Sequence, residues 1–350
     1  MKIVENVSLA DFTSFRTGGP AKKLITIESN DEIDAALEKA DKPLWFLGYG
    51  ANVLISDEGL DGTVIHLKTS TIDVEDGSLF IADAGVEWDT LVQTSIEHGK
   101  WGLERTSGIP GNVGAGIVGN IAAYGQAVSN SLAWVEVIDT ASDDLKIQKM
   151  ETSKLGLDYR YSDFQSDRLK DYLIVRAAFS LHSSPRPLEY ASAMKVAEEL
   201  KLDPNDLKQR REIILESRRR IGSLLEGEAK QTKTAGSFFR NPLVSAEQAE
   251  KIMSYEEHGI NYEQIKKQNA VHGGSAARVS AAHVLLAAGY KRGQSWGKVR
   301  LHPEHILKIE NYEGGTSQDI YNVAQEIIRT VKSKLGIDLE PEVRFLGHFN

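Results

Sequence analysis

A segment that combines many glycines with apolar residues constrains the fold of this chain more than any other feature. Residues 107–125 contain six glycines, more than a connecting turn needs. A backbone without Cβ atoms can turn its N–H groups toward an anion such as a pyrophosphate, and it needs no lysine to do so. A merely flexible loop is the alternative, but Ile109, Val113 and Ile117 are too apolar for a solvated loop. We therefore interpret the segment as a phosphate-binding cradle.

A second glycine-bearing segment competes for the same role. The stretch "LGYGANVLISD" contains Gly48 and Gly50 but no third glycine, and the residues after it have the pattern of a strand. A dinucleotide-binding fold of the Rossmann type needs a third glycine and a following helix. The sequence therefore argues against a Rossmann fold.

Size and composition indicate a soluble protein with more than one domain. The 350 residues, 41% of them hydrophobic, are enough for two or three cores. No run approaches the roughly 18 apolar residues of a membrane span, and the first residues lack the order of a signal peptide. We expect a cytoplasmic protein. The chain has no cysteine, which excludes disulfides and thiolate nucleophiles, so redox chemistry requires a bound cofactor.

The net charge of -9 argues against a protein that works on nucleic acid. One local exception is the basic stretch at 208–220. Asp203–Pro204 predicts the start of a helix there, with an N-cap and a first-turn proline. Leu207, Ile214 and Ile221 are spaced for one apolar face, so we expect the basic side chains to form the opposite, solvated face.

Strand-like and helical patterns alternate along the chain and predict an α+β fold. Strand-like runs at 132–140 and 172–182 follow the glycine-rich segment. A polar helical stretch over about 183–228 is expected to lead to another α/β region from about residue 231, with a helix from Ser280. A last helix is expected over 317–336, ending at Gly336. Its apolar face is formed by Ile320, Val323, Ile327 and Val331.

Six motifs, in this order and at these intervals, resemble one family of flavoenzymes. They are "FTSFRTGGPAKKLI", "FLGYGANVLISD", "GLERTSGIPGNVGAGIVGNIAAYG", "YRYSDF", "AGSFFRNP" and "LEPEVRFLG". Together they resemble the UDP-N-acetylmuramate dehydrogenase family, also called UDP-N-acetylenolpyruvoylglucosamine reductase, in its longer subtype with a substrate-loop tyrosine. The resemblance covers nearly the whole chain.

The resemblance implies a fold and a domain organisation. The fold is α+β, with an FAD-binding portion of the vanillyl-alcohol-oxidase-like (PCMH) type and a separate α/β substrate-binding domain. We expect FAD-binding subdomains at 1–70 and 71–228, the latter with a substrate loop near residue 190. The substrate-binding domain is expected at 229–336, and the C-terminal segment 337–350 is expected to return to the FAD-binding portion.

The resemblance also implies the reaction and its cofactors. The family reduces the enolpyruvyl ether of UDP-N-acetylglucosamine enolpyruvate to the lactyl ether of UDP-N-acetylmuramate in peptidoglycan precursor synthesis. NADPH is the reductant and FAD the cofactor. We expect non-covalent FAD, because no histidine or cysteine stands in a flavin-linking motif. The expected partners are the UDP-sugar and NADPH, with no nucleic acid and no membrane span, and we expect a monomer.

Three residues match the catalytic residues of the family: Arg160, Ser237 and Glu342. From the residues alone, Arg160 could be a surface cation paired with Asp158 or Asp163, and Glu342 a strand-edge charge beside Arg344. Ser237, in "TAGSFFRNP", could be the outward-facing residue of a core strand. The resemblance favours chemistry instead, with a cation that holds an enolate and a hydroxyl that gives it a proton.

The binding residues follow from the same motifs. Substrate contacts are implied for Tyr124, Tyr159, Tyr190, Arg220 and Asn241, since phenols and amides suit sugar and diphosphate oxygens. Cofactor contacts are implied for Gly48, Tyr49, Gly50, Ala51, Asn52, Val53, Ser107, Gly108, Ile109, Pro110, Gly111, Gly114, Asn120, Ala123 and Gly125.

The chain departs from the family pattern in two places. Ile221 stands where a lysine that contacts the diphosphate is usual, and Arg219 or Arg220 could substitute for it. Ala122 replaces a frequent glycine and narrows the room near the flavin. The pair His302 and His305 could suggest a metal, but no third ligand is near in sequence, and we expect none.

Two other functions remain open from the sequence. An FAD-dependent oxidase of the same cofactor-binding class would use oxygen, although it leaves "AGSFFRNP" and "EPEVRF" unexplained. A nucleotide-binding or nucleic-acid-binding protein would use the basic helix at 208–220. A yellow protein that NADPH bleaches indicates the reductase, one that is indifferent to NADPH indicates an oxidase, and a colourless one indicates a binding protein.

Overall fold

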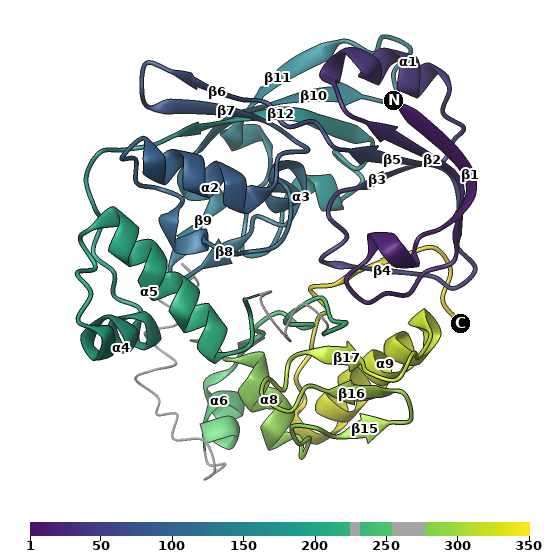
Figure 1. Ribbon diagram of the computed structural model, residues 1–350. Helices are drawn as coiled ribbons and strands as arrows, with labels where there is room; N and C mark the ends of the chain where they lie inside the picture. Colours follow the sequence, from purple (N-terminus) through teal and green to yellow (C-terminus); the bar gives the residue numbers. More distant parts are fainter. Residues whose placement is uncertain (225–231, 254–276) are drawn as a thin grey trace. The chain divides into compact units, whose positions relative to one another are not determined.

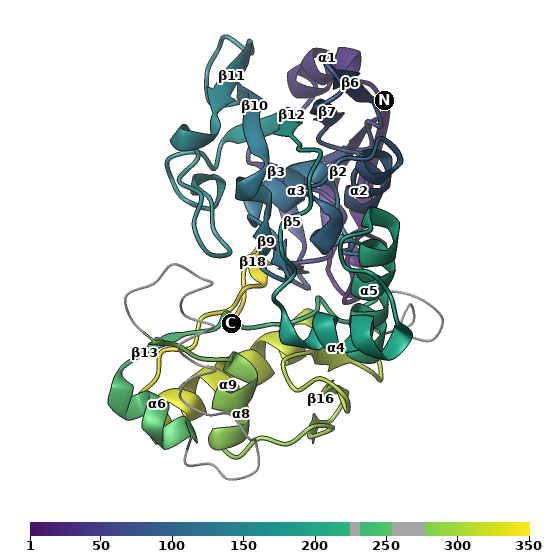
Figure 2. The ribbon, with the colours of Figure 1, turned by 90° about the vertical axis from the view of Figure 1, so that its left-hand side faces the viewer.

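The chain forms two compact units. The computed structural model describes residues 1–224, 232–253 and 277–350, and Figures 1 and 2 show it from two sides. The first unit comprises residues 1–7, 21–50 and 60–229, and the second comprises 8–20, 51–59 and 230–350. The boundary expected between residues 228 and 229 lies outside the described residues.

The first unit contains two larger sheets. One has the order β1-β2-β5-β3, with β2 and β3 parallel to β5. Its strands are β1 (Lys2–Ser8), β2 (Pro20–Ile27), β3 (Leu44–Leu47) and β5 (Leu60–Leu67), and α1 (Ile33–Glu38) follows β2. The other is antiparallel, with the order β11-β10-β12-β7-β6. Its strands are β6 (Ile72–Glu75), β7 (Leu79–Asp83), β10 (Leu132–Asp139), β11 (Ile147–Glu151) and β12 (Tyr172–Ser180).

Two helices cover one face of the antiparallel sheet. They are α2 (Trp88–Glu97) and α3 (Val113–Val118), which lie beneath β7 and β12 in Figure 1. Trp88 of α2 packs edge to face on Phe179 of β12, with ring centroids 5.8 Å apart. The apolar residues of β12 are buried. The strands expected at 132–140 and 172–182 are confirmed as β10 and β12.

The basic helix differs from its prediction. The structure has α4 (Ala191–Leu200) and α5 (Leu207–Arg220) in this region. Asp206 caps α5, its carboxylate accepting a hydrogen bond from Gln209 N at 2.8 Å. The predicted cap Asp203 instead closes the preceding turn by accepting from Asn205 N. Ile221 was expected on the apolar face, but it lies beyond the helix and is 46% exposed. Arg210 was expected on the solvated face, but it is fully buried. The predicted faces are therefore wrong for these two residues.

The second unit is a small α/β core. Its three-stranded sheet has the order β15-β16-β17, and α9 follows the apolar spacing that the sequence predicts. Ile320, Val323, Ile327 and Val331 are all buried, and Gly336 ends α9 with φ 68°. The elements are β4 (Val53–Ile55), β13 (Leu243–Val244), α6 (Ala246–Met253), β14 (Ala277–Arg278), α8 (Ala281–Ala287), β15 (Ser295–Trp296), β16 (Val299–Leu301), β17 (Ile309–Asn311), α9 (Ser317–Leu335) and β18 (Arg344–Leu346).

The remaining elements are short. The hairpin strands β8 (Ala122–Ala123) and β9 (Gln126–Ala127) belong to the first unit. The 3-10 turns are η1 (Ala10–Phe12), η2 (Asn30–Glu32), η3 (Glu104–Thr106), η4 (Val128–Asn130), η5 (Thr152–Lys154) and η6 (Asp163–Gln165). None of the helices within the described residues has both the length and the apolar character to cross a membrane.

Candidate active site

The glycine-rich segment packs closely on the loop that contains Gly48. Asn112 caps α3, and its Oδ1 accepts a hydrogen bond from Ala115 N at 3.0 Å. A Cβ at Gly48 would lie 2.5 Å from that Oδ1 and 2.9 Å from the Ala115 Cβ. Only glycine permits this approach, and it brings the Gly48–Gly50 turn against the start of α3.

Gly111 faces open space. A Cβ there would meet no protein atom within 4 Å, whereas a Cβ at Gly114 would lie 3.0 Å from the Ala84 Cβ. The segment therefore packs on protein at one position and leaves its backbone accessible at another. This arrangement fits the backbone cradle expected for the pyrophosphate of FAD.

An ion pair ties Gly108 of the cradle to α5. Gly108 N donates to Asp89 Oδ1 at 2.7 Å, and Arg211 binds both oxygens of Asp89 at 2.8 and 2.7 Å. Burial by itself would raise the pKa of Asp89, but the hydrogen bonds from Arg211 and Gly108 hold it below its usual value. The carboxylate therefore stays ionised at neutral pH, and α5 is fastened beside the cradle.

A two-residue turn presents Tyr124. It joins β8 to β9, and both of its residues have positive φ, 49° for Tyr124 and 77° for Gly125. This is the geometry of a type I′ hairpin. The Tyr124 ring meets the Tyr190 ring edge to face at 5.1 Å. Burial, with a smaller contribution from Tyr190, raises the pKa of Tyr124 to about 12, so the phenol is a hydrogen-bond donor throughout the physiological range.

A tight reversal of the chain presents Arg160. Asp158 and Tyr161 exchange backbone hydrogen bonds at 3.0 and 3.2 Å, which places Tyr159 and Arg160 at the tip. Arg160 has φ 54°, a conformation that is uncommon outside glycine and concentrates at functional sites. Asn120 Nδ2 donates to Asp158 O at 2.8 Å and fastens this tip to the end of the glycine-rich segment.

The two carboxylates considered as ion-pair partners of Arg160 also accept hydrogen bonds from other residues. Asp163 accepts hydrogen bonds from Arg168 and from the Tyr161 hydroxyl, the latter at 3.0 Å. Asp158 accepts from the backbone N of Tyr159 at 2.6 Å. Both carboxylates therefore have partners within the reversal itself, and Arg160 stands at its tip.

Ser237 belongs to the second unit and stands outside its core. Phe238 and Phe239 are 0% and 1% exposed, while Ser237 between Gly236 and Phe238 is half-buried. Phe238 N donates to Leu307 O at 2.8 Å and Phe238 O accepts from Glu342 N at 2.7 Å. The phenylalanines are therefore core residues, and they fix the backbone on which Ser237 and Glu342 are neighbours.

Asn52 links the second glycine segment to Glu342. Asn52 Nδ2 donates to Glu342 O at 3.1 Å, and Asn52 O accepts from Arg344 N at 3.1 Å. These bonds continue the parallel pairing of β4 with β18. Burial lowers the pKa of Arg344. Residues predicted for cofactor binding and for catalysis thus meet in this part of the second unit.

Comparison with known proteins identifies the family. A family model described as "FAD binding domain" matches residues 21–145, and one described as "UDP-N-acetylenolpyruvoylglucosamine reductase, C-terminal domain" matches residues 228–346. A UDP-N-acetylenolpyruvoylglucosamine reductase of Thermobifida fusca is 33% identical over 352 residues, covering 98% of this chain and 97% of the relative. This chain belongs to the UDP-N-acetylenolpyruvoylglucosamine reductase family.

Two further comparisons concern a second relative and the fold. A reductase of the same name from Streptomyces coelicolor is 31% identical, covering 98% of this chain and 90% of the relative. The crystal structure of the reductase from Thermus caldophilus matches 99% of this chain and 100% of its own, with a TM-score of 0.63 and 24% identity. The predicted fold class, an FAD-binding portion with a separate substrate-binding domain, is confirmed.

The predicted site residues are distributed over both units. Arg160 and Tyr190 lie in the first unit and outside both family-model matches, while Ser237, Asn241 and Glu342 lie in the second unit within the C-terminal match. Of the cofactor set, Ala51, Asn52 and Val53 belong to the second unit and all others to the first.

Two predicted substrate contacts have structural partners. Asn241 Oδ1 accepts from Ala281 N at 2.9 Å at the start of α8. Arg220 lies at the end of α5, exposed, and pairs with Glu216 and Glu199. The Arg220 guanidinium is thus engaged with carboxylates, which compete with any diphosphate.

Arg218 belongs to the site, although none of the sequence motifs indicates it. Burial lowers the pKa of Arg218, against the opposing influence of Tyr124 and Asp89, and Arg160 is close enough to lower it further. A Cβ at Gly108 would lie 3.6 Å from Arg218 Nε. Helical spacing could have revealed it, because Arg218 follows Ile214 of the predicted apolar face by four residues. We name the group of Tyr124, Tyr159, Arg160, Tyr190 and Arg218 the Tyr–Arg cluster.

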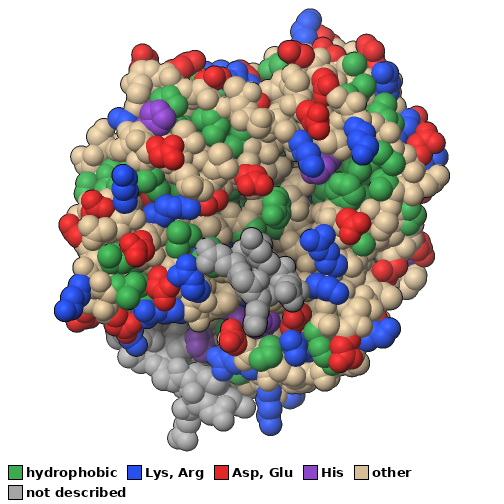
Figure 3. All heavy atoms as spheres, in the orientation of Figure 1, with side chains coloured by type: hydrophobic (Ala, Val, Ile, Leu, Met, Phe, Trp, Pro, Cys, Tyr) green, Lys and Arg blue, Asp and Glu red, His purple; other side chains and the backbone are tan. Residues whose placement is uncertain are grey.

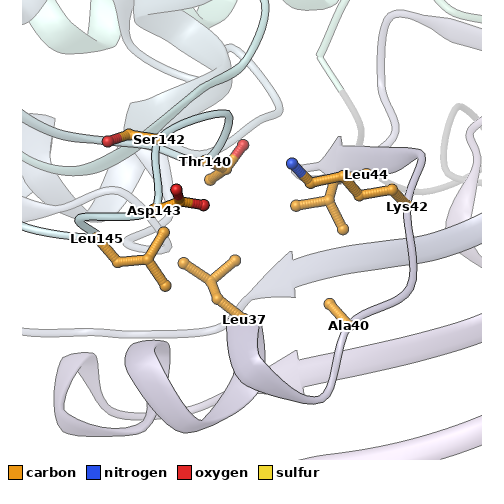
Figure 4. Close-up of a pocket in the computed structure, with 8 residues that line it drawn as sticks. All are labelled: Leu37, Ala40, Lys42, Leu44, Thr140, Ser142, Asp143 and Leu145. Atoms are coloured by element: carbon orange, nitrogen blue, oxygen red, sulfur yellow. The ribbon is translucent and has the colours of Figure 1, made fainter.

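One pocket of the first unit does not involve the predicted site residues. A pocket of about 260 Å³ in the first unit is lined by apolar side chains such as Leu37 and by Lys42 and Asp143 (Figure 4), none of them a predicted site residue. On the face of the molecule that Figure 3 shows, basic and acidic side chains are intermixed. Within the described residues, His302 and His305 do not belong to any group of three or more side chains that could hold a metal ion.

Proposed function

We propose that this protein reduces UDP-N-acetylglucosamine enolpyruvate to UDP-N-acetylmuramate, with NADPH as reductant and non-covalent FAD as cofactor. The observation that carries the proposal is the 33% identity over 98% of the chain with a reductase of this name. The reaction belongs to peptidoglycan precursor synthesis, and we propose a cytoplasmic, monomeric enzyme that acts on small molecules and not on nucleic acid.

FAD would be held mainly by backbone. The residues assigned to it are the Gly48–Val53 turn, the Ser107–Gly114 cradle and, beyond the cradle, Asn120, Ala123 and Gly125. When bound, FAD supplies a hydride, derived from NADPH, to the vinyl carbon of the substrate. The protein groups that do the remaining work are side chains of this chain.

Arg160 and Glu342 act on the charge that develops in the substrate. When a hydride adds to the vinyl methylene, negative charge builds on the adjacent carbon and its carboxylate as an enolate. A fixed cation next to that carboxylate stabilises the charge as it forms. Arg160 supplies the cation, from a backbone conformation that holds it at the tip of a tight reversal, and we assign Glu342 to the same chemistry from the family resemblance.

Ser237 completes the reaction by protonation. The carbon next to the carboxylate needs a proton to become the lactyl ether, and the Ser237 hydroxyl gives it. The sum of hydride and proton reduces one carbon–carbon double bond. The buried rings of Phe238 and Phe239 keep the serine backbone fixed, which a positioned acid requires.

The Tyr–Arg cluster binds the UDP-sugar. Tyr190 and Tyr124 present phenols, and Arg218 adds a partly buried cation near Arg160. A diphosphate carries charges that a guanidinium matches by paired hydrogen bonds. We propose that Arg218 contributes the positive charge that Ile221 lacks, with Tyr159, Asn241 and Arg220 as further contacts.

Absorbance at the flavin band tests the proposal. The purified protein should be yellow, should bleach with NADPH, and should recover its colour without oxygen when UDP-N-acetylglucosamine enolpyruvate is added. Mass spectrometry should find a product with two more hydrogens. A protein that NADPH does not bleach, but that oxygen reoxidises after reduction by an alcohol or sugar, would instead be an oxidase.

A further inference from the structure

A buried arginine that the proposed mechanism does not use lies beside the cradle. Arg105 is 8% exposed and belongs to η3. Its Nη2 donates to the carbonyl oxygens of Arg186 at 3.0 Å and Pro187 at 2.6 Å, and its Nη1 donates to the carbonyl of Tyr124 at 3.4 Å, the longest and weakest of the three. One planar side chain thus contacts the turn that presents Tyr124 and the segment that precedes Tyr190.

Glu104 holds this guanidinium in place. Glu104 is 2% exposed, and its Oε1 lies 3.5 Å from Arg105 Nε. Its other oxygen accepts hydrogen bonds from Gly102 N at 2.8 Å and Gln126 Nε2 at 3.2 Å. Gln126 in turn accepts from Arg105 N at 2.9 Å. The carboxylate is therefore anchored by the backbone on one side and neutralises Arg105 on the other.

A second buried cation reaches the same carbonyl. Arg210 Nη1 donates to Arg186 O at 2.7 Å and lies 3.3 Å from Glu104 Oε1. Its guanidinium stacks over Trp101, 4.6 Å from the ring centroid. The carbonyl of Arg186 is thus bound by two arginines that share one carboxylate, an arrangement that resists movement because displacing one member leaves buried charge uncompensated.

The chain between these carbonyls and Tyr190 is short. Leu188 follows Pro187, is 6% exposed and packs with Ile213 and Ile214 of α5. Tyr190 comes two residues later and meets the ring of Tyr124. Fixing the carbonyls of Arg186 and Pro187 therefore limits where the Tyr190 ring can lie.

We propose that Arg105 is a positioning residue for the UDP-sugar, because it sets the placement of Tyr190 relative to Tyr124. The inference rests on the proposed function for the identity of the ligand. A lysine keeps the positive charge that Glu104 needs but lacks the planar fork that bridges several carbonyls. Arg105→Lys therefore separates positioning from charge.

Steady-state and rapid-reaction kinetics test this with a matched control. The control is Arg176→Lys. Arg176 is a partly buried arginine of β12 in the same unit, and it pairs with Asp73 and Asp83. We expect Arg105→Lys to raise KM for the UDP-sugar about tenfold or more, with FAD content and the rate of reduction by NADPH within about twofold of the parent. Arg176→Lys should change neither. An unchanged KM, or an equal loss in the NADPH half-reaction, would overturn the proposal.

A double-mutant comparison shows whether Arg105 acts through the tyrosine. In a Tyr190→Ala background there is no ring to position, so Arg105→Lys should change KM by less than about twofold. If the second substitution raises KM by the same factor as in the parent, Arg105 acts by another route and the proposal fails.

Hydrogen exchange tests the positioning without any substrate. The amides of residues 188–190 should exchange at least about fivefold faster in Arg105→Lys than in the parent or in Arg176→Lys. If the parent forms no product, the proposed function fails while this measurement still decides the positioning, and unchanged exchange refutes it. If Arg105→Lys is insoluble, Glu104→Gln/Arg105→Gln keeps the net charge of the cluster and should show the same increase.

Discussion

The rings of Tyr124 and Tyr190 meet edge to face, with centroids 5.1 Å apart and planes at 75°. The two residues come from a hairpin turn and from the start of α4, 66 positions apart in the sequence. Aromatic pairs of this geometry contribute about 0.5–1.5 kcal/mol beyond their burial. The contact brings two phenols together in the Tyr–Arg cluster. Tyr190 is 46% exposed, and desolvation of its covered part, together with the neighbouring Tyr159, raises the pKa of its phenol.

Substitutions at Tyr190 separate the contribution of its ring to substrate binding from that of its hydroxyl. Tyr190→Phe keeps the ring contact and removes the hydroxyl, so we expect KM for the UDP-sugar to rise about tenfold, the cost of one hydrogen bond to a charged group. Tyr190→Ala should raise it further. Neither should alter reduction of the flavin by NADPH, measured by stopped-flow absorbance. A Tyr190→Phe enzyme with the parent KM would place the substrate loop elsewhere.

Arg218 should matter more than Arg220 for substrate binding. Arg218→Ala removes a partly buried cation, and we expect KM for the UDP-sugar to rise by a factor equivalent to about 1.5–3 kcal/mol. Arg220→Ala removes an exposed side chain paired with Glu216 and Glu199 and should stay within about threefold.

Ile221→Lys provides the complementary test. Because Ile221 is exposed, the new lysine can be accommodated and should tighten binding by at most ~1–3 kcal/mol. Titration of the UDP-sugar against flavin absorbance measures all three variants. Greater loss in Arg220→Ala than in Arg218→Ala would reverse the assignment of the two arginines.

Gly111 should be required for FAD rather than for folding. A side chain at Gly111 would extend into space that holds no protein atom within 4 Å, so Gly111→Val should give folded, colourless protein. Gly77→Val is the control, because Gly77 also has positive φ and open surroundings, in the turn between β6 and β7. Both variants carry backbone strain, and the strain is greater at Gly111, where φ is 148°, than at Gly77, where φ is 62°. If the Gly111→Val protein retains as much FAD as the Gly77→Val protein, the cradle lies elsewhere.

Ser237→Ala should impair only the second half-reaction. The substitution removes one oxygen, and transfer of a hydride from NADPH does not use that oxygen. Loss of a positioned general acid costs about 10²–10⁴ in rate, or roughly 3–5.5 kcal/mol of barrier. Rapid mixing of reduced enzyme with the enolpyruvyl substrate measures the step. Reoxidation within about tenfold of the parent would remove Ser237 from the mechanism, while Ser237→Cys should recover part of the rate.

His66 should make the first unit less stable in acid. Burial, assisted by Lys68, lowers the pKa of His66 to about 4 from an ordinary value of 6.5. The unfolded chain therefore binds a proton that the folded chain does not, so stability is complete above pH 6.5 and falls as pH decreases toward 4. At pH 5 the loss should be about 2 kcal/mol.

Denaturant unfolding followed by tryptophan fluorescence at pH 7.5 and pH 5 measures this effect. His66→Gln removes the titrating group and should reduce the difference in unfolding free energy between the two pH values. His348→Gln, which alters an exposed histidine, should leave the difference unchanged. If both variants behave like the parent, His66 contributes nothing to the acid sensitivity.

Local patterns in the sequence determined much of the fold. The apolar spacing of α9 predicts its buried face because a helix places residues three and four apart on one side whatever surrounds it. Gly336 predicts its end for an equally local reason, since glycine adopts positive φ without steric cost. The glycine content of residues 107–125 likewise predicts a backbone cradle, and the absence of cysteine requires a bound cofactor for redox chemistry.

Tertiary structure decided which charged side chains leave the solvent. The stretch around α5 predicts a basic, solvated face, yet Arg210 is fully buried because Glu104, 106 positions away, meets it there. Burial of a charge depends on a partner that desolvates with it, and no local pattern names that partner. The sequence thus determined the elements and the chemistry available. Contacts between distant segments decided that Arg105 and Arg218 lie beside the tyrosines, and that Ile221 is exposed to water.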